Sequence, residues 1–444
     1  MLMQAKKATG PCGKYGLKLL FARQREAAAM SCRHRHWAIR TASLLVLVAM
    51  TACTGRERQP AVPSALTEQA TVPGIANARF WADTQGHEMV QEVMLALARE
   101  RASQVAPASH DALPDVALAS ASYLSVSGGG DNGAFGAGLL VGWSESGTRP
   151  SFKLVTGIST GALIAPFAFL GSAYDPQLRT VYTDITPSEV YQRRWLIEAV
   201  FNDALSDTGP LFQLISRYAN ADLLAAVARE YRKGRVLMIG TTNLDQQRPI
   251  IWNIGAIAAS GQPGALDLFR KILLASASIP GAFPPVMIDV EAGGHRYQEM
   301  HVDGGAVAQT FLIPPQVSPI FRRHAPVRDR HAYIIRNGRL DPEWSSVDRR
   351  LLSITGRAIS TMIHYSGYND IFRIYTSSWR DGIDFNLAYI GADFTTERKE
   401  NFDQAYMRTL FQYGYRQARN GYRWFKQPPV MDMPDGRPNV DAQH

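Results

Sequence analysis

The sequence predicts a three-layer α/β/α fold with a mostly parallel central sheet. Residues 123–127 read as an apolar strand, and a glycine loop and a helix of small residues over 134–143 follow it. Residues 152–156 form a second strand that turns directly into a helix over 160–170. A strand, a helix and a second strand in succession need a crossover connection, so the two strands run parallel and helices cover both faces of the sheet.

Residues 1–52 contain all of the excess positive charge and are predicted to be a signal segment. The formal net charge of the 444 residues is +8, but the chain beyond residue 52 has equal numbers of basic and acidic groups. A basic stretch ending at Arg40 precedes a short apolar run over 42–50, which is typical of a secretion signal. Met30 offers an alternative start, in which case residues 1–29 are not translated. Because the charge lies in a segment that is removed, we expect no nucleic-acid partner.

Cys53 is the predicted lipidation site. The string Met50-Thr51-Ala52-Cys53 resembles the lipobox of bacterial lipoproteins, in which the cysteine is acylated and becomes the mature N-terminus. Thr54 resembles the sorting signal for the outer membrane. The resemblance implies a lipid-anchored protein of the bacterial cell envelope. All three cysteines lie at or before residue 53, so the folded part has no disulfide and no cysteine-based metal site.

The other elements follow in order. Residues 53–74 lack periodicity and are predicted to be the lipidated, flexible tether, and residues 75–427 are predicted to be the globular domain. A helix is expected over 75–106 and a mostly helical insertion over 176–233. The remaining predictions are strands over 235–243 and 249–253, a helix over 265–275, strands over 297–302 and 332–337, long C-terminal helices over 347–378 and 400–425, and a flexible tail over 428–444.

The pentapeptide 157–161, Gly-Ile-Ser-Thr-Gly, follows a predicted strand and precedes a predicted helix. In that context Ser159 lies on a sharp turn at the end of the strand, where flanking glycines let strand and helix approach closely. The helix that begins near Thr160 directs free backbone N–H groups towards Ser159. The pattern G-x-S-x-G also arises by chance, but this placement favours a nucleophilic serine.

The glycine loop 128–133, Gly-Gly-Gly-Asp-Asn-Gly, also fits the dinucleotide pattern G-x-G-x-x-G. That pattern requires an acidic residue at the end of the next strand, where this chain has Ser159 instead, and no lysine follows the glycines as in a phosphate-binding Walker loop. Both the loop and Ser159 follow neighbouring parallel strands, so they are expected at the same edge of the sheet. The amides of the loop can then stabilise an oxyanion. The predicted donors are Gly128, Gly129 and Gly130.

Together with Asp303-Gly304-Gly305, these two motifs resemble the patatin-like phospholipase family, and the resemblance covers about residues 123–336. The block 275–285 is also similar to the family. The resemblance implies lipid acyl hydrolysis with Ser159 as nucleophile and Asp303 as its base, on a membrane lipid substrate and without a metal or cofactor. Many members have Arg or Lys where this chain has Asn132. The glycines that belong to the motifs are Gly133, Gly157, Gly161, Gly304 and Gly305.

A carboxylate with an ordinary pKa is a weak base for an alcohol, so we expect Asp303 to be desolvated or Ser159 to be helped by the helix terminus. His301 lies two residues before Asp303 and has either a supporting or a structural role. A Ser-His-Asp triad in an α/β-hydrolase remains an alternative, although that fold places several strands before its serine. Its candidate histidines are His324, His331 and His364. A catalytically idle envelope lipoprotein that acts as a binding module is the non-enzymatic alternative.

Overall fold

The computed structural model places residues 58–444 in one compact unit. Every buried residue of the hydrophobic clusters lies after Arg58, so this unit contains its own core. The structure describes residues 58–104, 118–190, 192–193, 206–207, 209–313, 317 and 328–429. The signal segment 1–52, Cys53 and the tail from residue 430 lie outside these residues.

A mixed, mostly parallel nine-stranded sheet forms the centre of the unit, in the order β1-β7-β6-β3-β2-β10-β11, with β9 pairing β6 and β8 pairing β9. The strands from β6 to β11 in this order are parallel, and β1, β7, β8 and β9 pair antiparallel. The strands are β1 (Arg79–Trp81), β2 (Ala121–Val126), β3 (Phe152–Ile158), β6 (Val236–Asn243), β7 (Arg248–Asn253), β8 (Val286–Ala292), β9 (His295–Asp303), β10 (Arg330–Arg336) and β11 (Asp384–Tyr389).

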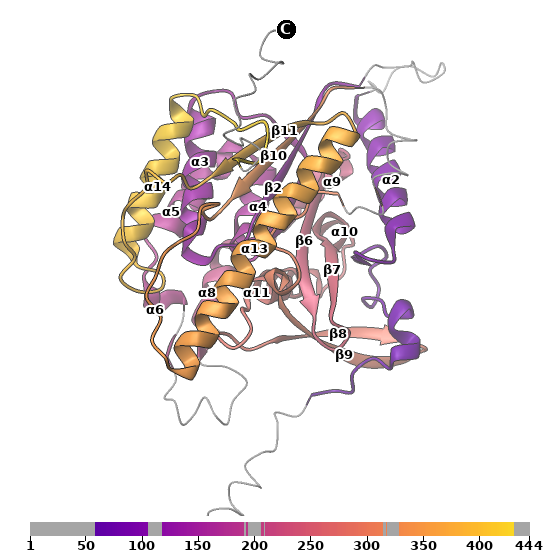
Figure 1. Ribbon diagram of the computed structural model, residues 1–444. Helices are drawn as coiled ribbons and strands as arrows, with labels where there is room; N and C mark the ends of the chain where they lie inside the picture. The colour runs from indigo at the N-terminus through magenta and orange to yellow at the C-terminus, as the bar shows by residue number, and fades with distance from the viewer. Residues whose placement is uncertain are drawn as a thin grey trace, which may run out of the picture. The chain divides into compact units, whose positions relative to one another are not determined.

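Helices cover both faces of this sheet, which confirms the predicted α/β architecture (Figure 1). Along β2, Leu124 and Val126 pack into one large core, while Tyr123 faces a second cluster on the other side. The first face carries α3 (Gly133–Glu145), α4 (Thr160–Leu170), α5 (Asp175–Thr183), α8 (Gly209–Tyr218), α9 (Ala221–Arg232), α10 (Ile254–Ala259), α11 (Ala265–Ala277) and α14 (Gln404–Arg419). The second face carries α2 (Gly86–Gln104) and α13 (Leu351–Arg380).

The predicted tether is wrong from Arg58 onwards, because this stretch packs on the domain. Arg58 binds Asp245 through a two-point ion pair, and Thr71 forms a β-bridge with Glu291. The short 3₁₀ helix Ser64–Gln69 lies between these contacts. The buried side chains of Val62 and Ala70 join Val290 in a small apolar cluster. This segment therefore packs on the domain although its sequence shows no helical or strand periodicity.

The other differences concern two strands that the sequence analysis did not predict, β8 and β11, and the boundaries of elements that it did predict. The helix predicted over 75–106 contains the edge strand β1 and begins only at Gly86. The insertion predicted over 176–233 is helical in its described parts, with the short helix α6 (Pro187–Val190) and the strand pair β4 (Gln192–Arg193) and β5 (Ser206–Asp207) added. Within the described residues, no helix is both long enough and apolar enough to cross a membrane.

Candidate active site

Ser159 lies on a strained turn between β3 and α4. Its backbone has φ 56° and ψ −128°, a conformation that residues other than glycine rarely adopt. A Cβ atom at Gly157 would lie 2.4 Å from the carbonyl oxygen of Gly161, and one at Gly161 would lie 2.2 Å from that of Val126. Both glycines of the pentapeptide are therefore required for the close approach of helix and strand that presents Ser159.

The backbone around Ser159 is fixed from the opposite side by α11. The Ser159 N–H donates to the hydroxyl of Ser276 at 3.0 Å, and this hydroxyl donates to the carbonyl of Gly240 on β6 at 2.7 Å. Ser276 is fully buried. The hydroxyl of Ser276 thus connects the turn to the neighbouring strand and sets the direction of the Ser159 side chain.

Asp303 is the last residue of β9 and lies beside Ser159. Thr241 of β6 pairs with it in the sheet, and the Gly305 N–H donates to its Oδ1 at 2.7 Å. Asp303 and Ser159 are only 4% and 6% exposed. Burial raises the pKa of Asp303 to about 7, although hydrogen bonds from the Ser159 hydroxyl and the Gly305 amide lower it. The desolvated carboxylate expected from the sequence is therefore present, and its pKa suits a general base near neutral pH.

The glycine loop lies against Ser159, but its amides are not equivalent. A Cβ atom at Gly128 would lie 3.2 Å from the Cβ atom of Ser159. The Gly128 N–H, however, donates to the carbonyl of Gln309 at 2.9 Å, so the prediction of Gly128 as an oxyanion donor is wrong. Gly129 and Gly130, with φ 156° and 58°, have amides that donate to no acceptor among the described residues. These two amides remain as candidate oxyanion donors.

Gln309 connects the two halves of the site, although it belongs to none of the motifs recognised in the sequence. Its backbone carbonyl accepts from Gly128, and its Nε2 donates to the carbonyl of Gly305 at 2.9 Å. Its own N–H donates to Asp370 of α13 at 2.6 Å. The segment that follows Asp303 therefore fixes the glycine loop, and α13 fixes that segment.

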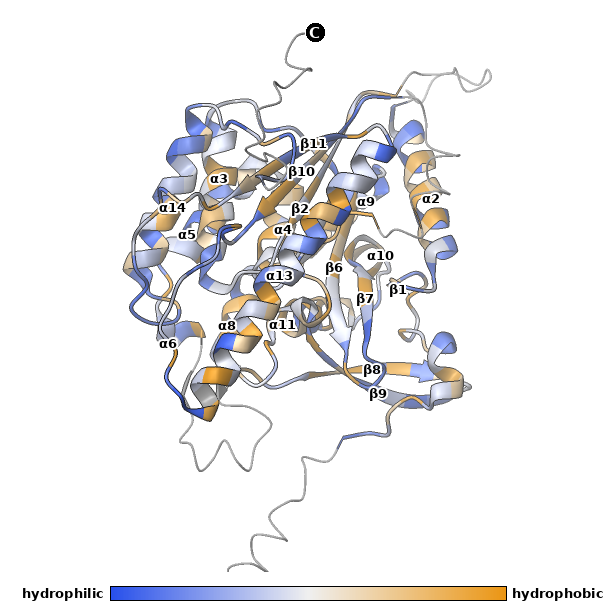
Figure 2. Ribbon diagram, in the orientation of Figure 1, coloured by the Kyte–Doolittle hydropathy of each residue, from blue (hydrophilic) through white to orange (hydrophobic). Residues whose placement is uncertain are grey.

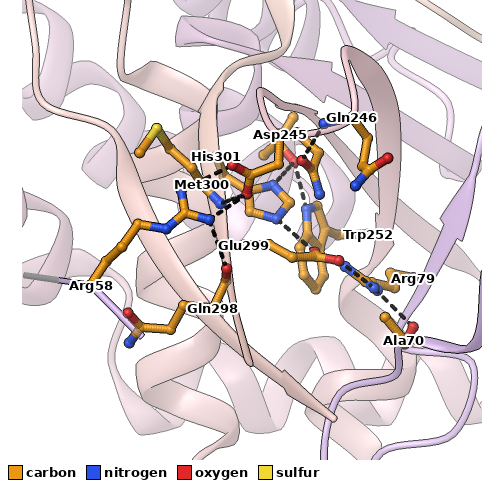
Figure 3. A network of polar contacts seen from close by, with 12 residues as sticks. Arg58, Ala70, Arg79, Asp245, Gln246, Trp252, Gln298, Glu299, Met300 and His301 are labelled. Carbon is orange, nitrogen blue, oxygen red and sulfur yellow. Dashed lines mark hydrogen bonds and ion pairs between the residues drawn. The ribbon is translucent and has the colours of Figure 1, made fainter. Parts of the chain in front are cut away.

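A buried polar network holds β9 in place next to Asp303 (Figure 3). The His301 ring contacts Glu299 through Nε2 at 3.1 Å and Thr241 through Nδ1 at 3.0 Å. Arg79 of β1 also binds the Glu299 carboxylate. Burial lowers the pKa of His301, which favours its neutral form. Both ring nitrogens of His301 are occupied within this network. Of the supporting and structural roles considered above, these contacts favour the structural role.

A comparison with known families identifies the segment that holds this geometry. The family model described as patatin-like phospholipase matches residues 124–314, which include the glycine loop, Ser159 and Asp303. This segment belongs to the patatin-like phospholipase family. Membership implies lipid acyl hydrolase activity.

The chain also has similar solved structures, while no curated protein matches it. VipD from Legionella pneumophila is 13% identical with a TM-score of 0.30, and the match covers 70% of this chain and 69% of that one. Human GIVD cytosolic phospholipase A2 is 10% identical with a TM-score of 0.26, and the match covers 72% of this chain and 53% of the human one. The present chain therefore spans about half the length of the human enzyme.

Two of the alternative histidines, His331 and His364, lie among the described residues, and each contacts a residue other than Ser159. His331 lies near the start of β10 and contacts Asp384, whereas Ser159 follows the end of the parallel strand β3. The ring of His364 on α13 packs against Tyr365. His324 lies outside the described residues. Among the residues that the structure describes, no three His, Cys, Asp or Glu side chains are grouped as metal ligands.

An apolar cavity of about 260 Å³ begins beside the two candidate catalytic residues. Ile158 and Gly304, the neighbours of Ser159 and Asp303, line one end of it. Phe311, Leu312 and the C-terminal part of α13 also line it, as do Asp83 and residues 249–251 of β7. The cavity thus lies between the sheet and α13, next to the point where an ester carbonyl would meet Ser159.

Proposed function

We propose that this protein is a serine lipid acyl hydrolase that cleaves acyl esters of glycerophospholipids or related lipids through a Ser159–Asp303 dyad. One observation carries the proposal: Ser159, on its strained turn, lies beside the buried carboxylate of Asp303, whose pKa burial raises to about 7. A carboxylate of ordinary pKa would accept a serine proton far less readily. The family match supports the substrate class.

The proposed reaction has two steps. Asp303 accepts the hydroxyl proton while Ser159 Oγ attacks the ester carbonyl, and the amides of Gly129 and Gly130 stabilise the oxyanion. Protonated Asp303 then gives its proton to the departing alcohol, which leaves an acyl-enzyme. Water, deprotonated by Asp303, attacks the carbonyl of this acyl-enzyme. Asp303 then returns the proton to Ser159 Oγ as the acyl–Oγ bond breaks and the fatty acid is released. The apolar cavity beside Ile158 offers space for the acyl chain.

Labelling with a fluorophosphonate probe tests the nucleophile. Residues 58–444 would be compared as wild type, Ser159→Ala, Asp303→Ala and His331→Ala, with the labelled peptide located by mass spectrometry. We expect a single label at Ser159, slower labelling without Asp303 and unchanged labelling in His331→Ala. Absence of a label in the folded wild type would favour the binding-module alternative. Loss of labelling and of ester hydrolysis in folded His324→Ala, His331→Ala or His364→Ala would favour a triad.

We also propose that an acylated Cys53 anchors the protein to the bacterial envelope, at the outer membrane, which would keep the enzyme near lipid substrates. The support is the sequence around Cys53 alone. Metabolic labelling with an alkyne fatty acid, followed by membrane fractionation of wild type and Cys53→Ala, tests the anchor. Equal labelling of the two proteins would contradict it.

A further inference from the structure

The N-terminal half of α13 extends beyond the sheet. Gly367 packs against the guanidinium of Arg336, the last residue of β10, and Asp370 binds the amide of Gln309. Packing on the sheet therefore begins near Gly367. The preceding part of the helix, residues 351–366, is about 24 Å long at roughly 1.5 Å per residue. It projects past the carboxyl end of β10, the same edge of the parallel sheet at which Ser159 follows β3.

Several residues of this projecting segment are hydrophobic, as the colouring of the α13 ribbon shows (Figure 2), and their side chains are exposed. Leu351 and Met362 are 80% and 71% exposed, and Trp344, just before the helix, is 90% exposed. More than half of the large hydrophobic residues exposed in the described part of the chain lie between residues 344 and 365. These are Trp344, Val347, Leu351, Ile354, Ile359, Met362 and Tyr365. A patch of this size on an otherwise polar surface marks an interaction site.

The exposed residues share one face of the helix. At about 100° per residue, Leu351, Ile354, Met362 and Tyr365 fall within an arc of about 80°. The residues that pack on the sheet, such as Ile371 and Ile374, fall on the opposite side of the helix axis. The sheet therefore cannot cover the apolar face, which remains open to a partner.

The charges beside this face are basic. Arg349, Arg350 and Arg357 lie between residues 344 and 366, where Asp348 is the only acidic residue. Arg350 and Arg357 fall on one flank of the apolar face at helical spacing. Arg357 also binds the carbonyl of Glu343, which holds the preceding loop, and with it Trp344, beside the first turns of the helix. An apolar face flanked by arginines and accompanied by an exposed tryptophan is typical of helices that lie in a lipid–water interface.

We propose that residues 344–366 form an interfacial docking element that binds an anionic lipid surface and brings the Ser159 edge of the sheet to it. The proposal rests on the proposed function only for its purpose, since docking itself needs no catalysis. The arginines match anionic headgroups, and the apolar face supplies the part that enters the acyl boundary.

Vesicle sedimentation with residues 58–444 carrying Ser159→Ala tests docking without turnover. The probe is vesicles of phosphatidylcholine mixed with phosphatidylglycerol. The variant Leu351→Gln/Ile354→Gln/Met362→Gln removes the apolar face with a residue of good helix propensity. We expect its partitioning to fall by roughly tenfold or more. The control Leu95→Gln/Leu244→Gln changes exposed leucines on other elements and should bind as the parent does. Binding should also weaken with added salt.

Equal vesicle binding by the parent and the triple variant would overturn the proposal. So would a concentration-dependent dimer that the triple variant abolishes while vesicle binding stays absent, because the face would then bind a second copy of the chain. Circular dichroism of each variant checks that the helix is retained.

Activity separates this inference from the proposed function. With Ser159 intact, the triple variant should hydrolyse a soluble short-chain ester normally and lose roughly tenfold or more in rate on vesicles. Docking without hydrolysis of any ester would contradict the proposed function and leave docking standing. If the triple variant hydrolysed both the soluble ester and the vesicle lipid as fast as the protein with an intact apolar face, that result would contradict docking alone.

Discussion

Glu299 and Asp303 lie four residues apart on β9, and both carboxylates are buried, but their environments are opposite. Burial would raise the pKa of Glu299, yet hydrogen bonding to His301 and the charge of Arg79 outweigh it and lower the pKa to about 2. Among the described residues, no cation contributes to the pKa of Asp303, and burial raises it to about 7. One carboxylate is thus neutralised by partners and serves the fold, while the other is left reactive at a cost to the fold.

Asp303→Asn should have the largest effect of the changes considered, because it alters both activity and stability. It removes the base, so we expect kcat/KM on a soluble ester to fall by about 10³-fold. Above pH 7 the folded wild type carries a desolvated charge that the unfolded chain carries freely, and stability is lost as pH rises from about 4 to 7. At pH 8 the variant should therefore be more stable than wild type, with a free energy of unfolding that is higher by roughly 2–4 kcal/mol. Urea denaturation measures this difference. A destabilised, active variant would contradict both assignments.

Glu299→Gln should have the opposite signature. It leaves the buried guanidinium of Arg79 without a countercharge, so we expect the free energy of unfolding to fall by roughly 3–5 kcal/mol. Glu291→Gln is a matched control, because Glu291 pairs with the exposed Arg296 on the adjacent strands β8 and β9. That change should cost less than about 1 kcal/mol. Urea denaturation at pH 7 measures both, and similar losses in the two variants would remove the distinction.

The pH dependence of the wild type should distinguish Asp303, which affects the rate, from Glu299, which affects stability. Deprotonated Asp303 is needed as base, so kcat/KM should rise with pH and level off with an apparent pKa of about 7. Glu299 contributes stability above its unfolded pKa of 4.5, and this contribution is lost as pH falls from there towards 2. Profiles of kcat/KM against pH test the expectation for Asp303, and urea titrations at several pH values test the expectation for Glu299. A rate profile that levels off near pH 4 would show that Asp303 is not desolvated.

Ser276→Ala should give the smallest effect, because it removes a positioning contact and leaves both carboxylates intact. The amide of Ser159 loses its acceptor, at a cost of about 1–2 kcal/mol, or roughly 5- to 30-fold in kcat. Ser278→Ala is the control, since the Ser278 hydroxyl donates to the carbonyl of Leu274 and makes no hydrogen bond with Ser159. Single-turnover rates with a chromogenic ester compare them. Equal losses in both variants would refute a specific positioning role for Ser276.

The sequence predicted the parts of the site that depend on local chain geometry. Gly157 and Gly161 are visible as a motif because a strand, a turn and a helix meet within a few residues. Gln309, Ser276 and Asp370 act through contacts with residues distant in the chain, and nothing in their own neighbourhoods marks them. The raised pKa of Asp303 could be expected from the chemistry, but its size depends on burial, which only the fold supplies.

The same distinction applies to the fold. The parallel strands β2, β3 and β6 were predicted because each is a short, mostly apolar run, and most of their residues are buried. The edge strand β1 has only three residues, and β11 was not distinguished from the segments around it. The packing of residues 58–74 could not be predicted either, because their contacts are with residues far away in the chain, such as Asp245, Glu291 and Gln298.

The backbone of Ser159 at φ 56° also bears on how this chain would change over generations. Glycine would adopt that turn with less strain, and asparagine at position 303 would carry no buried charge. Mutational drift governed by stability alone would therefore replace both residues early. Their joint presence in this chain is the pattern that selection for turnover, rather than for folding, leaves behind.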